Sequence, residues 1–259
     1  MKKRTHPTRW LRYLLLSAIL ALVVYLALVF GSRSFEDFCP FGGMESLWGL
    51  YQAREFSCTL GPLNLSMLIG VLVLALVAKK AFCGWACPIG FLGELGARLT
   101  GIFWRRRPQP SAQVNGALKL LRYVALVIAL YFTYKSGELI LRGYDPFFLI
   151  FSGFGHGALG VTSWIVLGAL VVGALVIPMF FCRYLCPLGA IFDPLSRLGI
   201  LKIVRDEAKC TNCNVCQKKC PQNLAPQAVV KLRHRDCTLC LECVDACPVK
   251  GALELKATL

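Results

Sequence analysis

The chain has 259 residues, of which 56% are hydrophobic, and it carries 14 cysteines and a formal net charge of +15. This composition is too apolar for an ordinary soluble domain, and the cysteines are too many for packing alone. A basic balance this strong is typical of proteins that bind nucleic acid, an acidic partner or a membrane surface, and the positions of the charges decide among these.

Four apolar stretches are candidate membrane spans, each of which needs about 20 apolar residues. They cover residues 11–30, 63–78, 117–134 and 159–181. The first follows a basic segment, as a secretory signal would, but its apolar part is too long and no small-x-small cleavage site follows. The second is short, and we expect Lys79 and Lys80 at its end to extend their long side chains to the interface.

The loop after the first span carries Cys39 and Cys58. It is expected on the outer, oxidising side, where a disulfide is the simplest interpretation. However, the CPF run at 39–41 resembles the DPF run at 145–147, at the matching place in the second half of the chain. A role of these cysteines as ligands or quinol contacts therefore stays open as the alternative.

Two further cysteine pairs follow the second and fourth spans, and both stand in the pattern F-C-x3-C-P-x-G. They are Cys83 with Cys87 and Cys182 with Cys186. The chain thus repeats span, span, C-x3-C-P, and membrane proteins with parallel repeats commonly place a site where the halves meet. The four thiols are therefore predicted to form one metal centre, an iron–sulfur cluster in addition to the two that the C-terminal motifs predict below. Packing and a redox-active thiol pair are the alternatives.

The segment 90–104 is predicted to be an amphipathic helix in the cytoplasmic interface. Its apolar face contains Phe91, Leu95, Leu99 and Ile102. Trp104 and the three arginines at 105–107 stand at its C-terminal end. We expect these arginines to anchor the chain to lipid and to set its topology rather than to bind a substrate.

Polar residues in the two outer loops are candidates for contacting quinol or accepting its protons. They are Glu36, Asp37, Glu138, Asp145 and His156. Ordinary solvated loop charge is the favoured interpretation for each of them. Since no histidine lies in the middle of a span, no membrane-embedded b-type haem is expected.

The C-terminal part carries the pattern C-x2-C-x2-C-x3-C-P twice. In such double motifs, three cysteines of one run bind one [4Fe–4S] cluster and the fourth binds the other. The predicted ligand sets are Cys210, Cys213, Cys216 and Cys247 for the first cluster, and Cys237, Cys240, Cys243 and Cys220 for the second. A zinc site or a disulfide-rich tail is the alternative, but neither suits a doubled eight-cysteine pattern on the cytoplasmic side.

The run KLRHRD at 231–236 connects the two motifs. It is either a solvated hairpin, which we favour, or a docking surface for an acidic partner. We place the domain boundary near Val204, giving a membrane domain at 1–204 and a ferredoxin-like domain at 205–259. The latter is too small for a robust core, so its clusters are expected to hold it folded.

The distribution of Lys and Arg predicts the orientation. With the N-terminus inside, 25 of the 29 lie on the cytoplasmic side and 4 in the outer loops. The basic excess is therefore explained by topology, and no nucleic acid needs to be invoked. The predicted fold is a mainly α, multi-pass protein of a bacterial or archaeal cytoplasmic membrane: four transmembrane helices in two parallel repeats, both termini cytoplasmic, and a C-terminal α+β two-[4Fe–4S] ferredoxin-like domain.

With these motifs in place, the chain resembles the NapH/NosR-type family of membrane iron–sulfur proteins. The resemblance rests on the four spans, the two C-x3-C-P motifs and the double ferredoxin motif, which together cover nearly the whole chain. It implies a quinol dehydrogenase subunit that feeds electrons toward a terminal reductase. NosR-type members add an outer flavin-binding domain, and a branch active in cytochrome oxidase maturation adds C-terminal domains; this chain shows neither.

Two functions of different class remain. The first is electron transfer between quinone or quinol and a redox partner that carries a flavin, c-type haem or iron–sulfur centre. The second is assembly or maturation, in which electrons reach a metal or thiol of a client enzyme and Cys39 and Cys58 form the outer contact. A redox sensor is a weaker third interpretation, since nothing resembles an output module.

Overall fold

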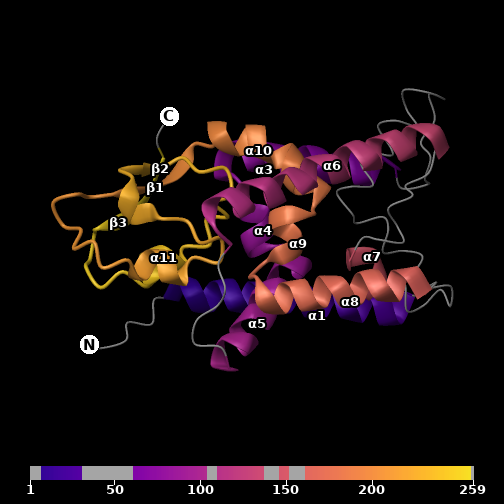
Figure 1. Ribbon diagram of the computed structural model, residues 1–259, viewed down its shortest axis with the longest axis horizontal. Helices are drawn as coiled ribbons and strands as arrows, with labels where there is room; N and C mark the ends of the chain where they lie inside the picture. The colour runs from indigo at the N-terminus through magenta and orange to yellow at the C-terminus, as the bar shows by residue number, and fades with distance from the viewer. Residues whose placement is uncertain (1–6, 31–60, 104–109, 137–145, 152–160, 258–259) are drawn as a thin grey trace.

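The computed structural model describes residues 7–30, 61–103, 110–136, 146–151 and 161–257. Long helices form one end of the molecule, and a small domain built on a three-stranded sheet forms the other (Figure 1). The sheet end is called the C-terminal domain, residues 201–257.

Four long helices coincide with the predicted apolar stretches: α1 (Pro7–Phe30), α3 (Gly61–Ala78), α6 (Ala112–Ser136) and α8 (Val161–Val176). The fourth stretch was predicted to continue to Phe181, which is wrong. Pro178 cannot continue a helix, and Met179 has a φ of 54°, so the chain turns there. A short helix, α7 (Pro146–Phe151), packs against α8.

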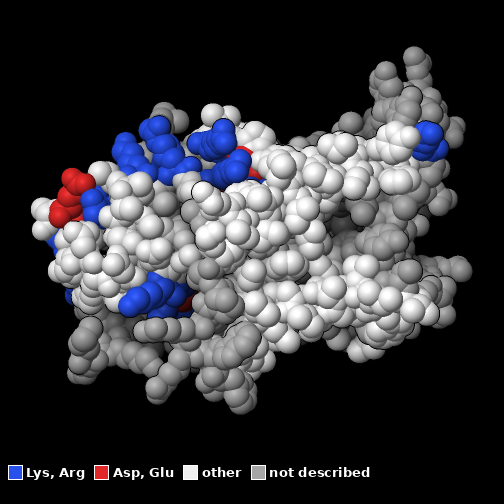
Figure 2. Space-filling view, viewed as in Figure 1, with Lys and Arg blue, Asp and Glu red and all other residues white. Residues whose placement is uncertain are grey.

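Two segments of these helices are long and apolar enough to cross a membrane, Thr8–Val29 and Gln113–Phe132, while Leu65–Ala78 and Ser163–Val176 are apolar but shorter. Only 11% and 17% of the two longer segments is buried inside the protein. On the face seen in Figure 2, Lys and Arg gather over the C-terminal domain and its junction with the helices, and the helical part is almost free of charge. Apolar helices left this uncovered suggest a membrane protein.

The internal repeat is visible in the backbone. After α3 come α4 (Ala81–Trp85) and α5 (Pro88–Phe103), and after α8 come α9 (Phe180–Tyr184) and α10 (Pro187–Leu198). A residue in the left-handed conformation, with a φ of 54°, precedes each short helix: Lys79 in one repeat and Met179 in the other. Each following helix begins at the proline of C-x3-C-P, which suits the first turn because it needs no N–H donor there.

The C-terminal domain contains an antiparallel sheet in the order β2-β1-β3, built from β1 (Leu201–Arg205), β2 (Lys231–Leu232) and β3 (Leu253–Ala257). Ile203 pairs with Leu232 on one side and with Leu255 on the other. Two short helices, α11 (Val215–Lys219) and α12 (Glu242–Asp245), and one 3-10 turn, η5 (Pro226–Ala228), complete it. Since β1 begins at Leu201, the sheet starts before the predicted boundary at Val204.

The start of α1 and the end of α3 lie at the C-terminal domain. The Thr8 hydroxyl at the start of α1 donates to Asp245 over 2.9 Å, and Lys79 at the end of α3 donates to the carbonyl oxygen of Leu232 over 2.6 Å. Ala78 packs into the core of the C-terminal domain beside Ile203. The domain is therefore docked onto the helices rather than tethered to them.

Candidate iron–sulfur sites

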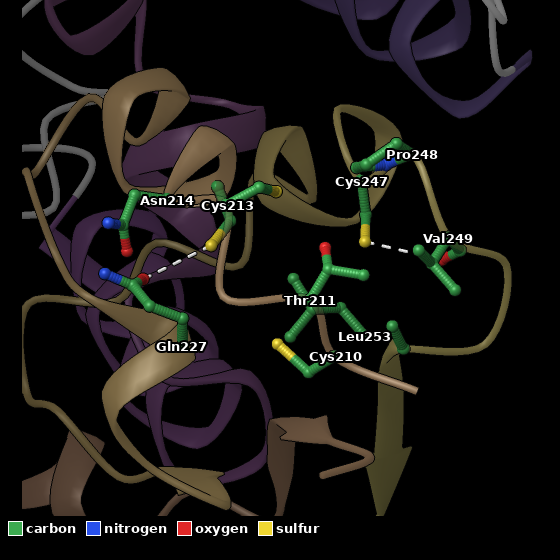
Figure 3. Close-up of a pocket in the computed structure, with 11 residues that line it drawn as sticks. Cys210, Thr211, Cys213, Asn214, Gln227, Cys247, Pro248, Val249 and Leu253 are labelled. Carbon is green, nitrogen blue, oxygen red and sulfur yellow. Dashed lines mark hydrogen bonds between the residues drawn. The ribbon is translucent and has the colours of Figure 1, made fainter. Parts of the chain in front are cut away.

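One hollow in the C-terminal domain is lined by cysteines of both motif runs. Its wall contains Cys210, Cys213 and Cys216 of the first run, Cys247 of the second, and Gln227. Figure 3 shows Cys210, Cys213 and Cys247 around this space with Gln227 at its edge. The hollow has about 350 Å³ of empty space, and we call it the first hollow.

A second hollow of nearly equal size, about 340 Å³, has the reciprocal lining. It contains Cys237, Cys240 and Cys243 of the second run and Cys220 of the first. The fourth cysteine of each run thus reaches across to the hollow of the other run. We call this the second hollow.

The two motif loops have the same backbone conformation. Asn212 and Asn214 in the first loop, and Leu239 and Leu241 at the same places in the second, all have φ between 47° and 60°. Asparagine adopts this left-handed region readily, whereas leucine does so at a cost. The loop shape is therefore imposed by the fold, and it turns backbone amides toward the cysteines: the amide of Val215 lowers the pKa of Cys213.

The four repeat cysteines, Cys83, Cys87, Cys182 and Cys186, are brought together by α4 and α9. Burial raises the pKa of the Cys83 thiol, and the charges of Cys87 and Cys186 raise it further. Burial likewise raises the pKa of Cys182, which also feels Cys87, Cys186 and Cys83. The two halves of the repeat meet here: a Cβ atom at Gly93 of α5 would stand 3.3 Å from the Cα of Met179, which directly precedes α9.

The turn that carries Cys83 and Cys87 is tight enough to require glycine at position 90. A Cβ atom at Gly90 would stand 2.4 Å from the carbonyl oxygen of Cys83, which no side chain can tolerate. This accounts for the glycine that ends the first F-C-x3-C-P-x-G pattern. At Gly189, the matching position, the distance to the Cys182 oxygen is 3.4 Å and the fit is looser.

The first repeat turn lies directly on the second motif loop. A Cβ at Gly84 would stand 2.7 Å from the Thr238 carbonyl oxygen, and the indole N–H of Trp85 donates to the Leu239 carbonyl oxygen over 3.0 Å. Arg12 donates from Nε to the Gly84 carbonyl oxygen over 2.8 Å. The residue after Cys83 and the residue after Cys237 are thus in contact.

A buried ion-pair cluster fixes this arrangement on one side. Asp236, directly before Cys237, accepts from Lys119 over 2.5 Å and from Arg122 over 2.8 Å, and it pairs with Lys80 at 3.3 Å. Burial alone would raise the pKa of Asp236, but these cations outweigh it and hold the pKa well below its usual range. Lys80 and Arg122 also pair with Asp193 of α10 at 2.6 Å each.

A second buried cluster lies on the other side and joins α1, α5 and α12. Glu94 and Glu242 both accept from Arg12, from Arg98 and from the Tyr13 hydroxyl. Glu242 directly precedes Cys243. Both clusters thus hold residues next to the second hollow against helices of the N-terminal part.

Two sequence interpretations are corrected by these contacts. The run 231–236 is solvated only in part: Lys231, Arg233 and His234 are exposed, whereas Leu232 and Asp236 are buried. Lys79 and Lys80 do not extend to an interface; they are 1% and 4% exposed and bond within the protein. The loop candidates lie outside the described residues: Glu36, Asp37, Cys39, Cys58, Glu138, Asp145 and His156.

The donor set suits an iron–sulfur cluster better than a single ion. Within the described ranges, no three His, Cys, Asp or Glu side chains converge closely enough to hold one metal ion. A cluster instead takes one thiolate at each of several irons, so its ligands stand apart around a space. Four thiols around a hollow meet that demand.

Two family models match the chain. A 4Fe-4S binding domain matches residues 60–109 and 159–205, which contain the two repeat turns. A 4Fe-4S dicluster domain matches residues 202–248, which contain both motif loops. No solved structure matches the chain.

Several known proteins are similar over most of the chain. A Methanocaldococcus jannaschii protein, MJ0749, is 34% identical over 188 residues, 72% of this chain and 68% of that protein. The putative electron transport protein YccM of Escherichia coli is 27% identical over 265 residues, 91% of this chain and 72% of its own length. The ferredoxin-type protein NapH of Escherichia coli is 31% identical over 185 residues, 67% of this chain and 61% of that protein.

The two matched family models cover the features that the structure brings together: the two C-x3-C-P turns of the helical part and the motif loops of the C-terminal domain. The chain belongs to the NapH/NosR-type family of 4Fe-4S proteins.

Proposed function

We propose that this protein is a membrane electron-transfer subunit that exchanges electrons between the quinone pool and a redox partner. The contact between Gly84 and Thr238 carries the proposal, because it joins the repeat cysteines to the second hollow without any intervening layer of protein. Two relatives are printed as a putative electron transport protein and a ferredoxin-type protein, and both family models are 4Fe-4S domains, which supports iron–sulfur electron transfer. The quinone and the partner are our extension of it.

Four membrane spans in two repeats are proposed, with both termini on the cytoplasmic side. The starts of α1 and α6 and the ends of α3 and α8 all lie toward the C-terminal domain, as they must in such a bundle (Figure 1). The two shorter helices expose apolar side chains as the longer ones do; Ile165 of α8 is 65% exposed. Basic residues also gather at this end, which fits the cytoplasmic side.

Each hollow would hold one [4Fe–4S] cluster. Cys210, Cys213, Cys216 and Cys247 are the proposed ligands in the first hollow, and Cys237, Cys240, Cys243 and Cys220 those in the second. A cluster bound there supplies reversible one-electron transfer. The chain contributes the ligands, the amides of the left-handed turns, and the exclusion of water.

The four repeat cysteines are proposed to hold a third centre. Their mutual electrostatic influence supports this, as does the match of a 4Fe-4S binding domain to both repeat turns. The three sites then follow one another from the helices to the far end of the C-terminal domain. Cys213 in the first hollow is exposed, so a partner carrying a flavin, c-type haem or iron–sulfur centre could approach there.

Iron and acid-labile sulfide, counted per chain in detergent-purified protein, test the cluster part. Three four-iron clusters give about twelve irons and two give about eight. A count near eight would remove the third centre, and a count near zero would remove the function altogether.

The quinone part is tested with the same preparation. Addition of a short-chain quinol should reduce the clusters, or addition of the quinone should oxidise dithionite-reduced clusters, as followed by their visible absorbance. If neither occurs while the clusters are intact, the chain carries electrons but does not exchange them with quinone.

A further inference from the structure

The short helix α4 contacts the second motif loop through two consecutive residues. The indole N–H of Trp85 donates to the Leu239 carbonyl oxygen over 3.0 Å, and a Cβ atom at Gly84 would stand 2.7 Å from the Thr238 carbonyl oxygen. Both residues of α4 lie between the cysteines of the first C-x3-C-P motif, and both carbonyls lie between the first two cysteines of the second run. The helical part therefore contacts two successive carbonyl oxygens of a loop that lines the second hollow.

The matching residues of the second repeat bond elsewhere. Arg183 and Tyr184 occupy the places of Gly84 and Trp85 in the second C-x3-C-P motif. Nη2 of Arg183 and the hydroxyl of Tyr184 both donate to the side-chain oxygen of Asn115 in α6, over 2.8 Å each. The contact with a motif loop is therefore a property of the first repeat and does not follow from the C-x3-C-P turn in general.

The second motif loop needs more support than the first. Leu239 and Leu241 have φ of 47° and 60°, which is costly for leucine, whereas the first loop has asparagine at both matching places. Within the part of the chain that the structure describes, nothing donates to the carbonyl oxygen of Asn212, the counterpart of Leu239; its side chain accepts from Arg205 over 3.2 Å instead. The bond from Trp85 therefore stabilises a turn that its own sequence disfavours.

This bond also fixes the direction of the next amide group. A trans peptide unit is planar, and its C=O and N–H groups point in opposite directions. Leu239 and Cys240 line the second hollow, whereas Trp85 is not part of the lining, so the Leu239 oxygen is held away from the hollow. The N–H of Cys240 belongs to the same peptide unit and is therefore directed to the side of the hollow.

We propose that Trp85 is a positioning residue for the cluster held in the second hollow. Its indole N–H holds the peptide unit between Leu239 and Cys240 so that the Cys240 amide donates to a sulfur atom of the bound cluster. This inference rests on the proposed function. Hydrogen bonds to sulfur help to set the potential of such clusters, and they strengthen as the cluster gains negative charge on reduction. The helical part thereby raises the reduction potential of the cluster docked beside it.

The test compares Trp85→Phe with Trp10→Phe in the purified full-length protein, by redox titration monitored by electron paramagnetic resonance. Trp85→Phe keeps an aromatic ring and removes the N–H donor, while Trp10 on α1 is 63% exposed and gives the matched control. The signal that Cys240→Ser removes or alters identifies the second-hollow cluster. In Trp85→Phe we expect its reduction to become about fivefold less favourable, a drop of about 40 mV for one electron. Trp10→Phe should leave every potential within about twofold of wild type.

A spectroscopic measurement separates positioning from general destabilisation. Electron–nuclear double resonance of the reduced wild-type protein should detect an exchangeable proton coupled to the second-hollow cluster, and the signal should disappear in deuterium oxide. This coupling should weaken in Trp85→Phe and stay unchanged in Trp10→Phe. A coupling that is equal in wild type and Trp85→Phe would show that the indole N–H does not place the amide.

Other outcomes also overturn the inference. An unchanged potential of the second-hollow cluster in Trp85→Phe would do so, as would equal shifts in all centres or a shift confined to the centre of the repeat cysteines. If Trp85→Phe retains no cluster in the second hollow, Trp85→His decides, because its ring keeps an N–H donor of similar reach: retention of the cluster supports the inference, and loss overturns it. Absence of all clusters from the wild-type protein would instead refute the proposed function, so the two failures are distinguishable.

Discussion

Gly84 lies so close to the carbonyl oxygen of Thr238 that a Cβ atom at Gly84 would stand 2.7 Å from it. The two residues are far apart in the sequence, yet each directly follows the first cysteine of its own motif. A glycine therefore stands where the repeat turn meets the second motif loop, and the loop leaves no room for a side chain. This contact joins the repeat turn that carries Cys83 to the motif loop that carries Cys237.

Gly84→Ala is predicted to weaken the docking of the C-terminal domain. The added methyl group meets a backbone oxygen, which cannot move aside as a flexible side chain could, so we expect a loss of about 1–3 kcal/mol in stability. Hydrogen exchange of amides at 237–243, measured by mass spectrometry, should become faster. Gly70→Ala is the matched control, because nothing lies within 4 Å of a Cβ there, and it should be neutral or slightly stabilising.

Asp236→Asn is predicted to destabilise the junction with α6 and α10. The carboxylate is 3% exposed and forms ion pairs with Lys80, Lys119 and Arg122. Its replacement by a neutral amide therefore leaves buried positive charges without a counter-charge. Breaking a buried ion pair typically costs about 3–5 kcal/mol. Thermal unfolding in detergent should show the loss.

The control for this variant is Glu254→Gln. Glu254 pairs with Lys256 at 3.1 Å, but both side chains are about half exposed, and such surface pairs contribute at most about 1 kcal/mol. Equal effects of the two variants would mean that the Asp236 cluster does not hold the domain in place.

Cysteine spacing is a local property of the sequence, and the predicted sets are those that line the two hollows. Their role as cluster ligands stays a prediction. The long helices were likewise predictable from their apolar runs, apart from the early end of α8 at Pro178. The ion-pair clusters were not. Lys79, Lys80, Arg12 and Arg122 were counted as topology signals, and their number alone gave no sign that they are buried.

The missing information was the location of their partners. Asp193, Asp236 and Glu242 lie far along the chain from the cations they meet. The packing of α10 on α3 and α6 brings Asp193 to its partners, and the docking of the C-terminal domain brings Asp236 and Glu242 to theirs. One signal was available: each of Asp236 and Glu242 directly precedes a motif cysteine, where an ordinary solvated charge has little reason to stand beside a negatively charged cluster. Arg183, which is also buried, had no comparable signal, because its burial follows from α9 packing against α6.

Cys83→Ser and Cys186→Ser are predicted to damage the same centre. The two residues lie in different repeats but act on each other electrostatically, so removal of either should remove one spectroscopic component and the same share of iron. The two C-terminal clusters should keep their signals. Mössbauer spectra of iron-57-labelled variants give the measurement.

Cys210→Ser is the matched control for that pair, since it lines the first hollow and should affect a different component. Should Cys83→Ser and Cys186→Ser abolish different components, or leave the iron content unchanged, the four repeat cysteines would not share a centre. Packing or a thiol pair would then be the better description.

Removal of iron is predicted to unfold the C-terminal domain and to leave the long helices intact. The domain has a three-stranded sheet whose longest strands have five residues, and its core includes Cys216, Cys237 and Cys243. A core this small gains much of its stability from the bound metal. In the apo protein those thiols and the strained turns at Leu239 and Leu241 lose the ligand that holds them.

The measurement is limited proteolysis after treatment with an iron chelator and an oxidant. Cleavage should begin within 201–257, while fragments containing α1 to α10 persist. Reconstitution with iron and sulfide should restore protection, which separates cluster loss from irreversible damage. If apo protein resists proteolysis as the loaded protein does, the ion pairs of Asp236 and Glu242 suffice to hold the domain folded, and the clusters serve electron transfer alone.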